Sequence, residues 1–110
     1  MIAGIDLIKN DCIFAQNMVA DNIKAVSAAI TKSGREMVYS LSPGGENNLV
    51  KLVEDAKTIS ADVNIYRITG DWHGGNLEHH FAVAEAMSQA GLIGAFSAQE
   101  FTERGDRLCV

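Results

Sequence analysis

Apolar residues gather in three short runs along the chain, and these runs predict its strands. Each run is rich in β-branched, aromatic or leucine side chains, as is usual for strands buried in a sheet. Each also ends at turn-forming or polar residues, such as Pro43 or the Gly74–Gly75 pair. The predicted strands cover residues 2–9, 36–41 and 64–69, and residues 92–95 would begin a fourth.

Between these runs, apolar residues recur every three or four positions, which predicts helices. The expected spans are 18–32, from Asn47 or Asn48 to residue 59, and from about residue 76 to Gly91. Gly34 and Gly91 suit helix ends, and the asparagines suit an N-cap. The side chains expected to face inward are Val19, Ile23, Val26 and Ile30, then Leu49, Leu52, Val53 and Ala56, and then Leu77, Phe81, Ala84 and Met87.

Strands and helices therefore alternate about once every ~30 residues, as in βαβ units. This order predicts an α/β fold in which strands near 5–9, 37–41 and 64–69 lie parallel and adjacent, with the helices on one outer face. Residues 96–110 have little periodicity and receive no assignment. In parallel sheets of this kind, functional groups lie at the carboxyl ends of the strands.

All three predicted strands end in polar side chains. Lys9 and Asp11 follow the first, Ser40 and Ser42 end the second, and the third runs into the segment NIYRITGDW at residues 64–72. Alternation along that segment puts Arg67, Thr69 and Asp71 on one side. Such a set indicates either a functional site or a structural Arg–Asp pair that closes a strand end, and both interpretations stay open at this point.

Composition narrows the class of protein. The chain has 110 residues, 47% hydrophobic and 21% charged, as is ordinary for one globular domain. A net charge of -5 with scattered basic residues argues against nucleic-acid binding. No apolar stretch approaches the ~18 residues of a membrane span, and the first residues lack a signal-peptide pattern. Cys12 and Cys109 either pair or remain thiols.

Three segments, DLIKND, GREMVYSLSPG and YRITGD, resemble consecutive strands of the clan-D α-galactosidases, especially glycoside hydrolase family 27, the melibiases. That family has a (β/α)8 TIM barrel whose fourth strand ends in Lys-x-Asp and whose sixth carries Arg-x-x-x-Asp. Here these motifs are residues 9–11 and 67–71. The resemblance covers about residues 4–95 and implies that residues 1–110 are one segment of such a barrel, about strands four to six and possibly the start of seven, incomplete at both ends.

The resemblance also implies a function, that of a retaining α-galactosidase cleaving terminal α-linked galactose from an oligosaccharide or glycoconjugate. Asp11 would be the nucleophile and Asp71 the general acid/base, while Lys9, Arg67, Ser42 and Trp72 would bind the sugar. A Ser at position 42 is also the residue found in α-N-acetylgalactosaminidases. The family's location would be extracellular or lysosomal/vacuolar.

The physical chemistry agrees with these roles. A retaining glycosidase needs two carboxyl groups ~5–5.5 Å apart, one ionised and one protonated. Lys9, two residues before Asp11 on the same side of a strand, would favour the ionised form of Asp11. The apolar ring of Trp72 beside Asp71 would favour the protonated form there. Trp72 would equally well cover the end of the sheet.

Other interpretations remain beside this one. The chain would alternatively be a non-catalytic or truncated barrel fragment that functions only by assembly, self-associating through its open sheet edges. No cofactor or metal is predicted, because His79 and His80 are adjacent and lack the spacing of metal ligands. Cys12 is more often a buried structural cysteine than a nucleophile. Gly44–Gly45 lacks the lysine of a phosphate loop.

Overall fold

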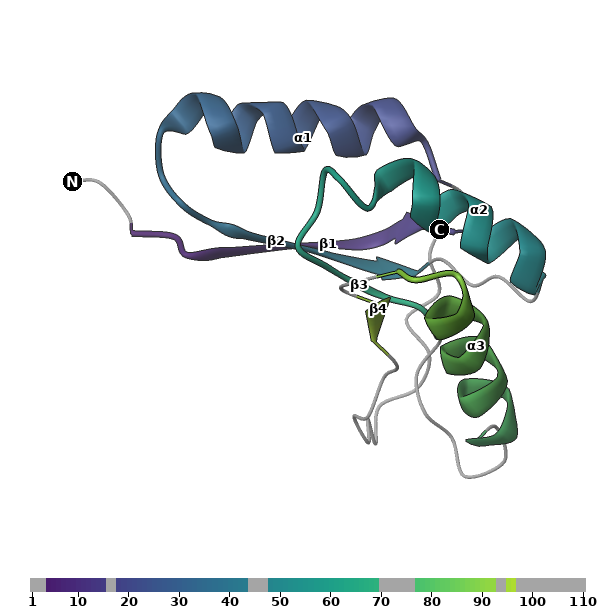
Figure 1. Cartoon of the computed structure of the whole chain (residues 1–110). Coiled ribbons are helices and arrows are strands. Elements are labelled where there is room, and N and C mark those ends of the chain that lie inside the picture. Colours follow the sequence, from purple (N-terminus) through teal and green to yellow (C-terminus); the bar gives the residue numbers. More distant parts are fainter. Residues whose placement is uncertain (1–3, 16–17, 44–47, 70–76, 93–94, 97–110) are drawn as a thin grey trace.

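The computed structural model describes residues 4–15, 18–43, 48–69, 77–92 and 95–96, in which strands and helices alternate (Figure 1). Within these ranges the strands are β1 (Leu7–Phe14), β2 (Val38–Pro43), β3 (Ile65–Arg67) and β4 (Ala95–Phe96). The helices are α1 (Ala20–Ser33), α2 (Leu49–Ile59) and α3 (Leu77–Gln89). The predicted alternation of β and α units is therefore confirmed.

The strands form one parallel sheet whose order follows the sequence, β1-β2-β3-β4. Leu7 pairs with Val38, and Lys9 pairs with Ser40. Ser40 pairs in turn with Ile65 on the other side of β2. The prediction of adjacent, parallel strands is confirmed.

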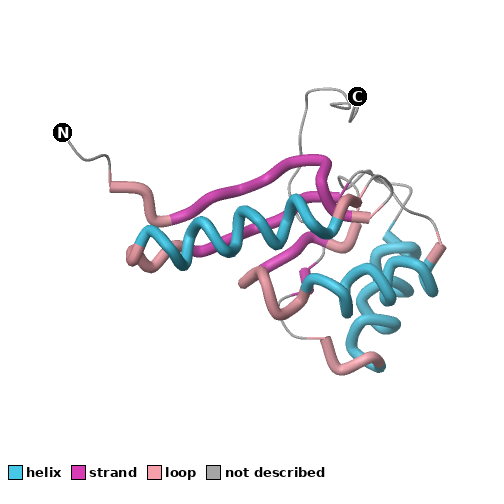
Figure 2. The backbone as a smooth tube through the Cα atoms, turned by 90° about the horizontal axis from the view of Figure 1, so that it is seen from above, coloured by secondary structure: helices cyan, strands magenta, loops and turns pink. Residues whose placement is uncertain are grey.

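This strand order places the helices on one side of the sheet. Crossovers between parallel strands are right-handed, so a sheet whose order never reverses receives every crossover on the same face. α1 packs beside α2, and α2 packs beside α3. Figure 1 shows α1 and α2 above the sheet, and the view from above in Figure 2 shows α1 running along β1 and β2.

The core lies between this helix layer and the sheet. One cluster of buried side chains joins the inward residues of the strands to those of all three helices. It comprises Phe14, Ala15, Ile23, Tyr39, Leu41, Leu52, Ala56, Ile59, Tyr66, Ile68, Val83 and Met87. The rings of Phe14 and Tyr66 meet in it with centroids 5.5 Å apart. The Tyr66 hydroxyl is buried and has no hydrogen-bond partner in the described structure.

The helix ends follow local capping rules. The Asn48 side chain accepts a hydrogen bond from the Lys51 backbone N–H at 3.1 Å, which confirms it as the N-cap of α2. Gly34 adopts a left-handed φ of 72° after α1, where its N–H bonds to the Thr31 carbonyl. Among the described residues, no helix has both the length and the apolar character that a membrane crossing needs.

Two of the predicted helix faces need correction. On α3, Leu77 and Phe81 are 49% and 69% exposed, whereas His80, Val83 and Met87 are buried. The buried stripe is thus rotated relative to the expected one, and only Met87 belongs to both. On α1, Ile23 is buried and Val26 and Ile30 pack against the core, but Val19 is exposed at the N-cap.

The predicted bounds of the strands were also partly wrong. β1 was expected to end at Lys9, but it continues to Phe14. It continues because Phe14 returns to the core after the polar residues and pairs with Pro43. β2 likewise includes Ser42 and Pro43, which were expected to end it. Lys9 and Asp11 therefore lie inside β1, not beyond it.

Asn64 fastens the start of β3 to β2 by two hydrogen bonds. Its backbone N–H donates to the Tyr39 carbonyl at 3.0 Å, and its side-chain oxygen Oδ1 accepts from the Tyr39 N–H at 2.8 Å. Tyr39 is buried and Asn64 is exposed, so these bonds lie where the core meets the solvent. The Asn64 side chain thus supplies one of the hydrogen bonds that join β2 to the chain at the start of the three-residue β3.

Replacing Asn64 by Ala should therefore destabilise the fold. The Tyr39 N–H would lose the acceptor of a part-buried hydrogen bond, which typically costs about 0.5–1.5 kcal/mol of unfolding free energy. Urea denaturation of Asn64→Ala measures this loss. Asn22→Ala, on the exposed surface of α1, is the matched control and should change the unfolding free energy by less than about 0.5 kcal/mol. Equal effects of the two variants would contradict the role given to Asn64.

Candidate functional site

The side of the sheet that faces away from the core carries the residues singled out in the sequence. We call it the far face and define it by Leu7, Lys9, Val38, Ser40, Ile65 and Arg67. Paired residues of neighbouring strands point to the same side of a sheet, and successive residues point to opposite sides. Because Tyr39, Leu41 and Tyr66 belong to the core, the residues between them belong to the far face.

The far face changes from apolar to polar along the strand direction. Leu7 and Val38, which are paired near the starts of β1 and β2, are both exposed. The next far-face pair along these strands is Lys9 with Ser40. Arg67 follows at the end of β3. Polar groups thus collect towards the carboxyl ends of the strands, where parallel α/β proteins place their chemistry.

β1 brings both Lys9 and Asp11 to this face. Exposed and half-buried residues alternate strictly from Leu7 to Cys12, and the exposed members are Leu7, Lys9 and Asp11. Regular pairing with β2 stops at Asn10 and resumes at Phe14, and Cys12 between them has a left-handed φ of 56°. Asp11 therefore lies where β1 begins to depart from its neighbour, next to an irregularity of the kind that often re-aims a side chain near a site.

Ser42 and Arg67 approach the same region from β2 and β3. The register pairs Ser40 with Ile65 and Leu41 with Tyr66, so one further step sets Ser42 opposite Arg67. Ser42 is only 1% exposed, and Arg67 is half-buried. At this exposure the Ser42 hydroxyl is covered in the structure, whereas a half-buried guanidinium supplies the planar set of hydrogen-bond donors that binds polar ligand groups.

The remaining two site residues, Asp71 and Trp72, lie outside the described residues. The structure thus brings Lys9, Asp11, Ser42 and Arg67 to one side of one sheet, towards the same end. It leaves the pairing of Asp11 with Asp71 as a prediction.

Sequence reasoning missed a polar contact directly behind this site. Asn10, between Lys9 and Asp11, turns to the core side and donates from Nδ2 to the Tyr39 hydroxyl at 2.8 Å. Burial raises the pKa of the Tyr39 phenol, and the Asn10 hydrogen bond acts in the opposite direction. The contact ties β1 to β2 at the residue that separates the two charged side chains. The only sequence signal was a polar residue at an inward position of a strand.

Among the described residues, Cys12, His79 and His80 do not gather into a second site. Cys12 is disulfide-bonded, so its sulfur is not a free thiolate nucleophile, and Cys109 lies outside the described residues. His80 is buried in the α3 face, and His79 is half-buried. Within the described part of the chain, no three His, Cys, Asp or Glu side chains gather where they could hold a metal ion.

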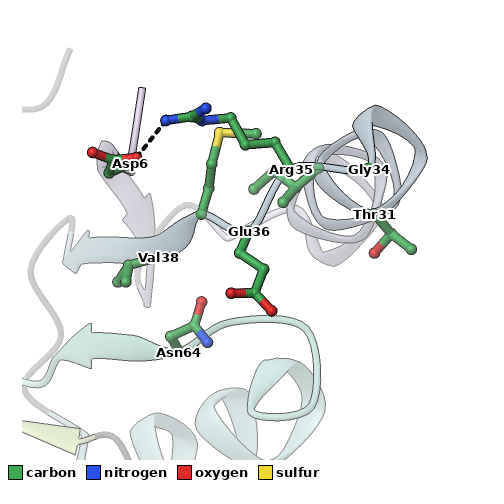
Figure 3. A pocket seen from close by; sticks show the side chains of 9 residues that line it. Asp6, Thr31, Gly34, Arg35, Glu36, Val38 and Asn64 are labelled. Carbon is green, nitrogen blue, oxygen red and sulfur yellow. Dashed lines mark hydrogen bonds and ion pairs between the residues drawn. The ribbon is translucent and has the colours of Figure 1, made fainter. Parts of the chain in front are cut away.

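A hollow of about 740 Å³ lies at the opposite end of the sheet, between the end of α1 and the starts of the strands (Figure 3). Figure 3 shows Arg35 reaching across it to Asp6, with the ion pair at 2.6 Å. Arg35 also donates from Nε to the Ile5 carbonyl at 2.8 Å. Its cation is thus engaged in joining the segment before β1 to the segment before β2, which is a structural task.

Comparisons with known protein-family models, with curated proteins and with solved structures yield no match. The chemistry of the far face therefore carries the functional interpretation, together with the motifs around Lys9 and Arg67.

Two buried tyrosines, Tyr39 and Tyr66, should respond differently to the same substitution. Tyr39→Phe removes the acceptor of the Asn10 amide and should lower the unfolding free energy by about 1 kcal/mol. Tyr66→Phe removes a buried hydroxyl that has no described partner, so it should leave the unfolding free energy unchanged or raise it by up to about 1 kcal/mol. Urea denaturation of both variants measures these changes. A larger loss of unfolding free energy for Tyr66→Phe than for Tyr39→Phe would contradict this assignment.

The same two tyrosines should make the unfolding free energy depend on pH. Burial raises the pKa of both phenols above their ordinary value of 10.0. Above that pH the unfolded chain releases these protons while the folded chain retains them, so the unfolding free energy should fall as the pH rises through the folded values. Tyr66→Phe should show a shallower fall than the unmodified protein. If the unfolding free energy fell equally steeply with pH in both proteins, Tyr66 would not be a buried, neutral phenol.

Proposed function

We propose that this chain is a β/α segment of a retaining glycoside hydrolase that removes terminal α-linked galactose. The observation that carries the proposal is the exposure of Lys9 and Asp11 on the far face of β1, on the same side of the sheet as Arg67 of β3. These are the residues that the resemblance to family 27 assigns to catalysis and sugar binding.

The topology supports the corresponding architecture, a (β/α)8 barrel of which this chain would supply about strands four to six and the start of seven. A barrel of this kind has parallel strands in sequence order and helices on the outside only. Its interior is packed with branched apolar side chains, and its active site lies at the carboxyl ends of the strands. The far face has this distribution, from Leu7 and Val38 at one end to Lys9 and Arg67 at the other.

In the proposed reaction, the Asp11 carboxylate attacks the anomeric carbon while Asp71 protonates the departing glycosidic oxygen. The bond from sugar to leaving group breaks as the bond from sugar to Asp11 forms. Asp71 then removes a proton from water, whose oxygen displaces Asp11 and releases galactose with its original configuration. Lys9, Arg67, Ser42 and Trp72 hold the sugar hydroxyls and ring.

The strand order is compatible with the separation that this mechanism needs. β2 lies between β1 and β3, so two strand spacings of ~4.8 Å set their backbones about 10 Å apart. Carboxyl groups that lean towards each other from such positions reach the ~5–5.5 Å of retaining enzymes.

The test is hydrolysis of an aryl α-galactoside by a protein in which the remaining barrel strands complete this segment, compared with its Asp11→Ala variant. We expect the substitution to reduce turnover to the background rate, because the nucleophile is lost. Added azide should restore product formation as a glycosyl azide of inverted configuration, which distinguishes a lost nucleophile from a damaged fold. Unchanged turnover in Asp11→Ala would refute the assignment.

Asp6→Ala is the matched control. Asp6 is an exposed carboxylate just before β1, at the other end of the strand, where it pairs with Arg35. It should leave turnover unchanged and lower the unfolding free energy by less than about 1 kcal/mol. Parallel assays with an α-N-acetylgalactosaminide show which of the two sugars is hydrolysed, and therefore which sugar Ser42 accommodates.

A further inference from the structure

Asp11 lies just beyond the part of β1 that pairs regularly with β2. This pairing runs from Leu7 to Asn10 and resumes only at Phe14. Cys12, directly after Asp11, has a left-handed φ of 56°, so the backbone there departs from ordinary strand geometry. The direction in which Asp11 points therefore depends on how firmly Asn10, the last regularly paired residue before it, is held.

Asn10 is held by its side chain as well as by its place in the strand. Its Nδ2 donates to the Tyr39 hydroxyl at 2.8 Å. Successive residues of a strand point to opposite sides, so an Asn10 fixed on the core side leaves Lys9 and Asp11 facing the other way. The burial of β1 has this pattern, because Lys9 and Asp11 are exposed and Asn10 is half-buried.

Tyr39 is itself fixed in the sheet. Its side chain is buried in the core, and its backbone N–H and carbonyl both bond to Asn64 at the start of β3. The hydrogen bonds of Asn64, Tyr39 and Asn10 thus cross the sheet from β3 through β2 to β1. They connect the strand that carries Arg67 with the strand that carries Asp11.

We propose that Asn10 is a positioning residue, which through the Tyr39 hydroxyl holds the Asp11 carboxylate in the direction needed to attack the anomeric carbon. This inference rests on the glycosidase function proposed above, and it gives Asn10 and Tyr39 a part in that reaction from the core side of the sheet. An attacking group displaced by about 1 Å loses ~10²-fold in rate, so one hydrogen bond behind the nucleophile is enough to control turnover.

A contact that only stabilised the fold would give different kinetics. Its loss would lower the amount of folded enzyme and leave kcat per folded molecule unchanged. A misdirected nucleophile instead slows the chemical step in every folded molecule. Lys9 pairs with Ser40 in the regular part of the strand, so its contact with the sugar should survive and KM should stay the same. A loss of kcat at constant KM is therefore the sign of positioning.

The kinetic test uses Asn10→Leu, which removes the donor, and Tyr39→Phe, which removes the acceptor, in the protein completed by the remaining barrel strands. Rates on an aryl α-galactoside are referred to the folded fraction measured by circular dichroism. We expect each variant to lower kcat about 10–100-fold and to change KM less than about twofold. The double variant should lose no more kcat than either single variant, because all three lack the same hydrogen bond.

Tyr66→Phe is the matched control. It removes the same hydroxyl from the other buried tyrosine, one that has no hydrogen-bond partner in the described structure. We expect it to keep both kcat and KM. A loss of kcat in Tyr66→Phe equal to that in Tyr39→Phe would overturn the proposal, and so would additive losses in the double variant.

A second measurement needs no activity and uses this chain alone. ¹⁵N relaxation reports how rigidly the Asp11 backbone is held. We expect its order parameter to fall from about 0.85 to below about 0.6 in Asn10→Leu and in Tyr39→Phe, and to stay unchanged in Tyr66→Phe. An unchanged order parameter, or an unchanged kcat, in the first two variants would overturn the proposal. Absence of turnover in the unmodified completed protein would refute the glycosidase function, whereas the order parameters show separately whether Asn10 holds Asp11.

Discussion

The handedness of the crossovers is the constraint on which this structure depends. Each βα connection returns to the sheet on the same side, because the strands are parallel and their order never reverses. Period-two alternation then divides every strand between two environments. Tyr39, Leu41 and Tyr66 enter the core, and the residues between them are left on the far face, where polar and charged side chains gather towards one end.

Side-chain amides hold this arrangement together beside a short strand and beside an irregular one. Tyr39 is the common partner, since its hydroxyl accepts from Asn10 and its backbone exchanges two hydrogen bonds with Asn64. Asn10 precedes the irregular part of β1, and Asn64 precedes the three residues of β3. Both contacts supply partners to polar groups of a buried tyrosine, and short polar side chains suit these places for that reason.

Much of this fold was readable from the sequence because apolar spacing reports burial directly. The order of elements, the parallel sheet and the cap at Asn48 followed from local rules, and alternation correctly put Lys9 and Asp11 on one side of β1. The end of β1 could not be predicted from the sequence, because consecutive polar residues such as Lys9, Asn10 and Asp11 resemble the end of a strand. The buried face of α3 was misjudged because Phe81 is more apolar than His80, yet packing against α2 and the sheet selected the stripe of His80, Val83 and Met87. The contact of Asn10 with Tyr39 joins residues 29 positions apart, beyond the reach of any local pattern.

The irregularity in β1 has a consequence for how its length can vary. From Asn10 to Phe14 the chain advances four residues while β2 advances two, from Leu41 to Pro43, so β1 holds two extra residues. That excess is even, which returns Phe14 to the core side, where its ring meets Tyr66. Inserting or deleting a single residue here would reverse the parity and turn Phe14 outward, whereas a change of two would preserve it. The segment that carries Asp11 can therefore be remodelled in steps of two without disturbing the core behind it.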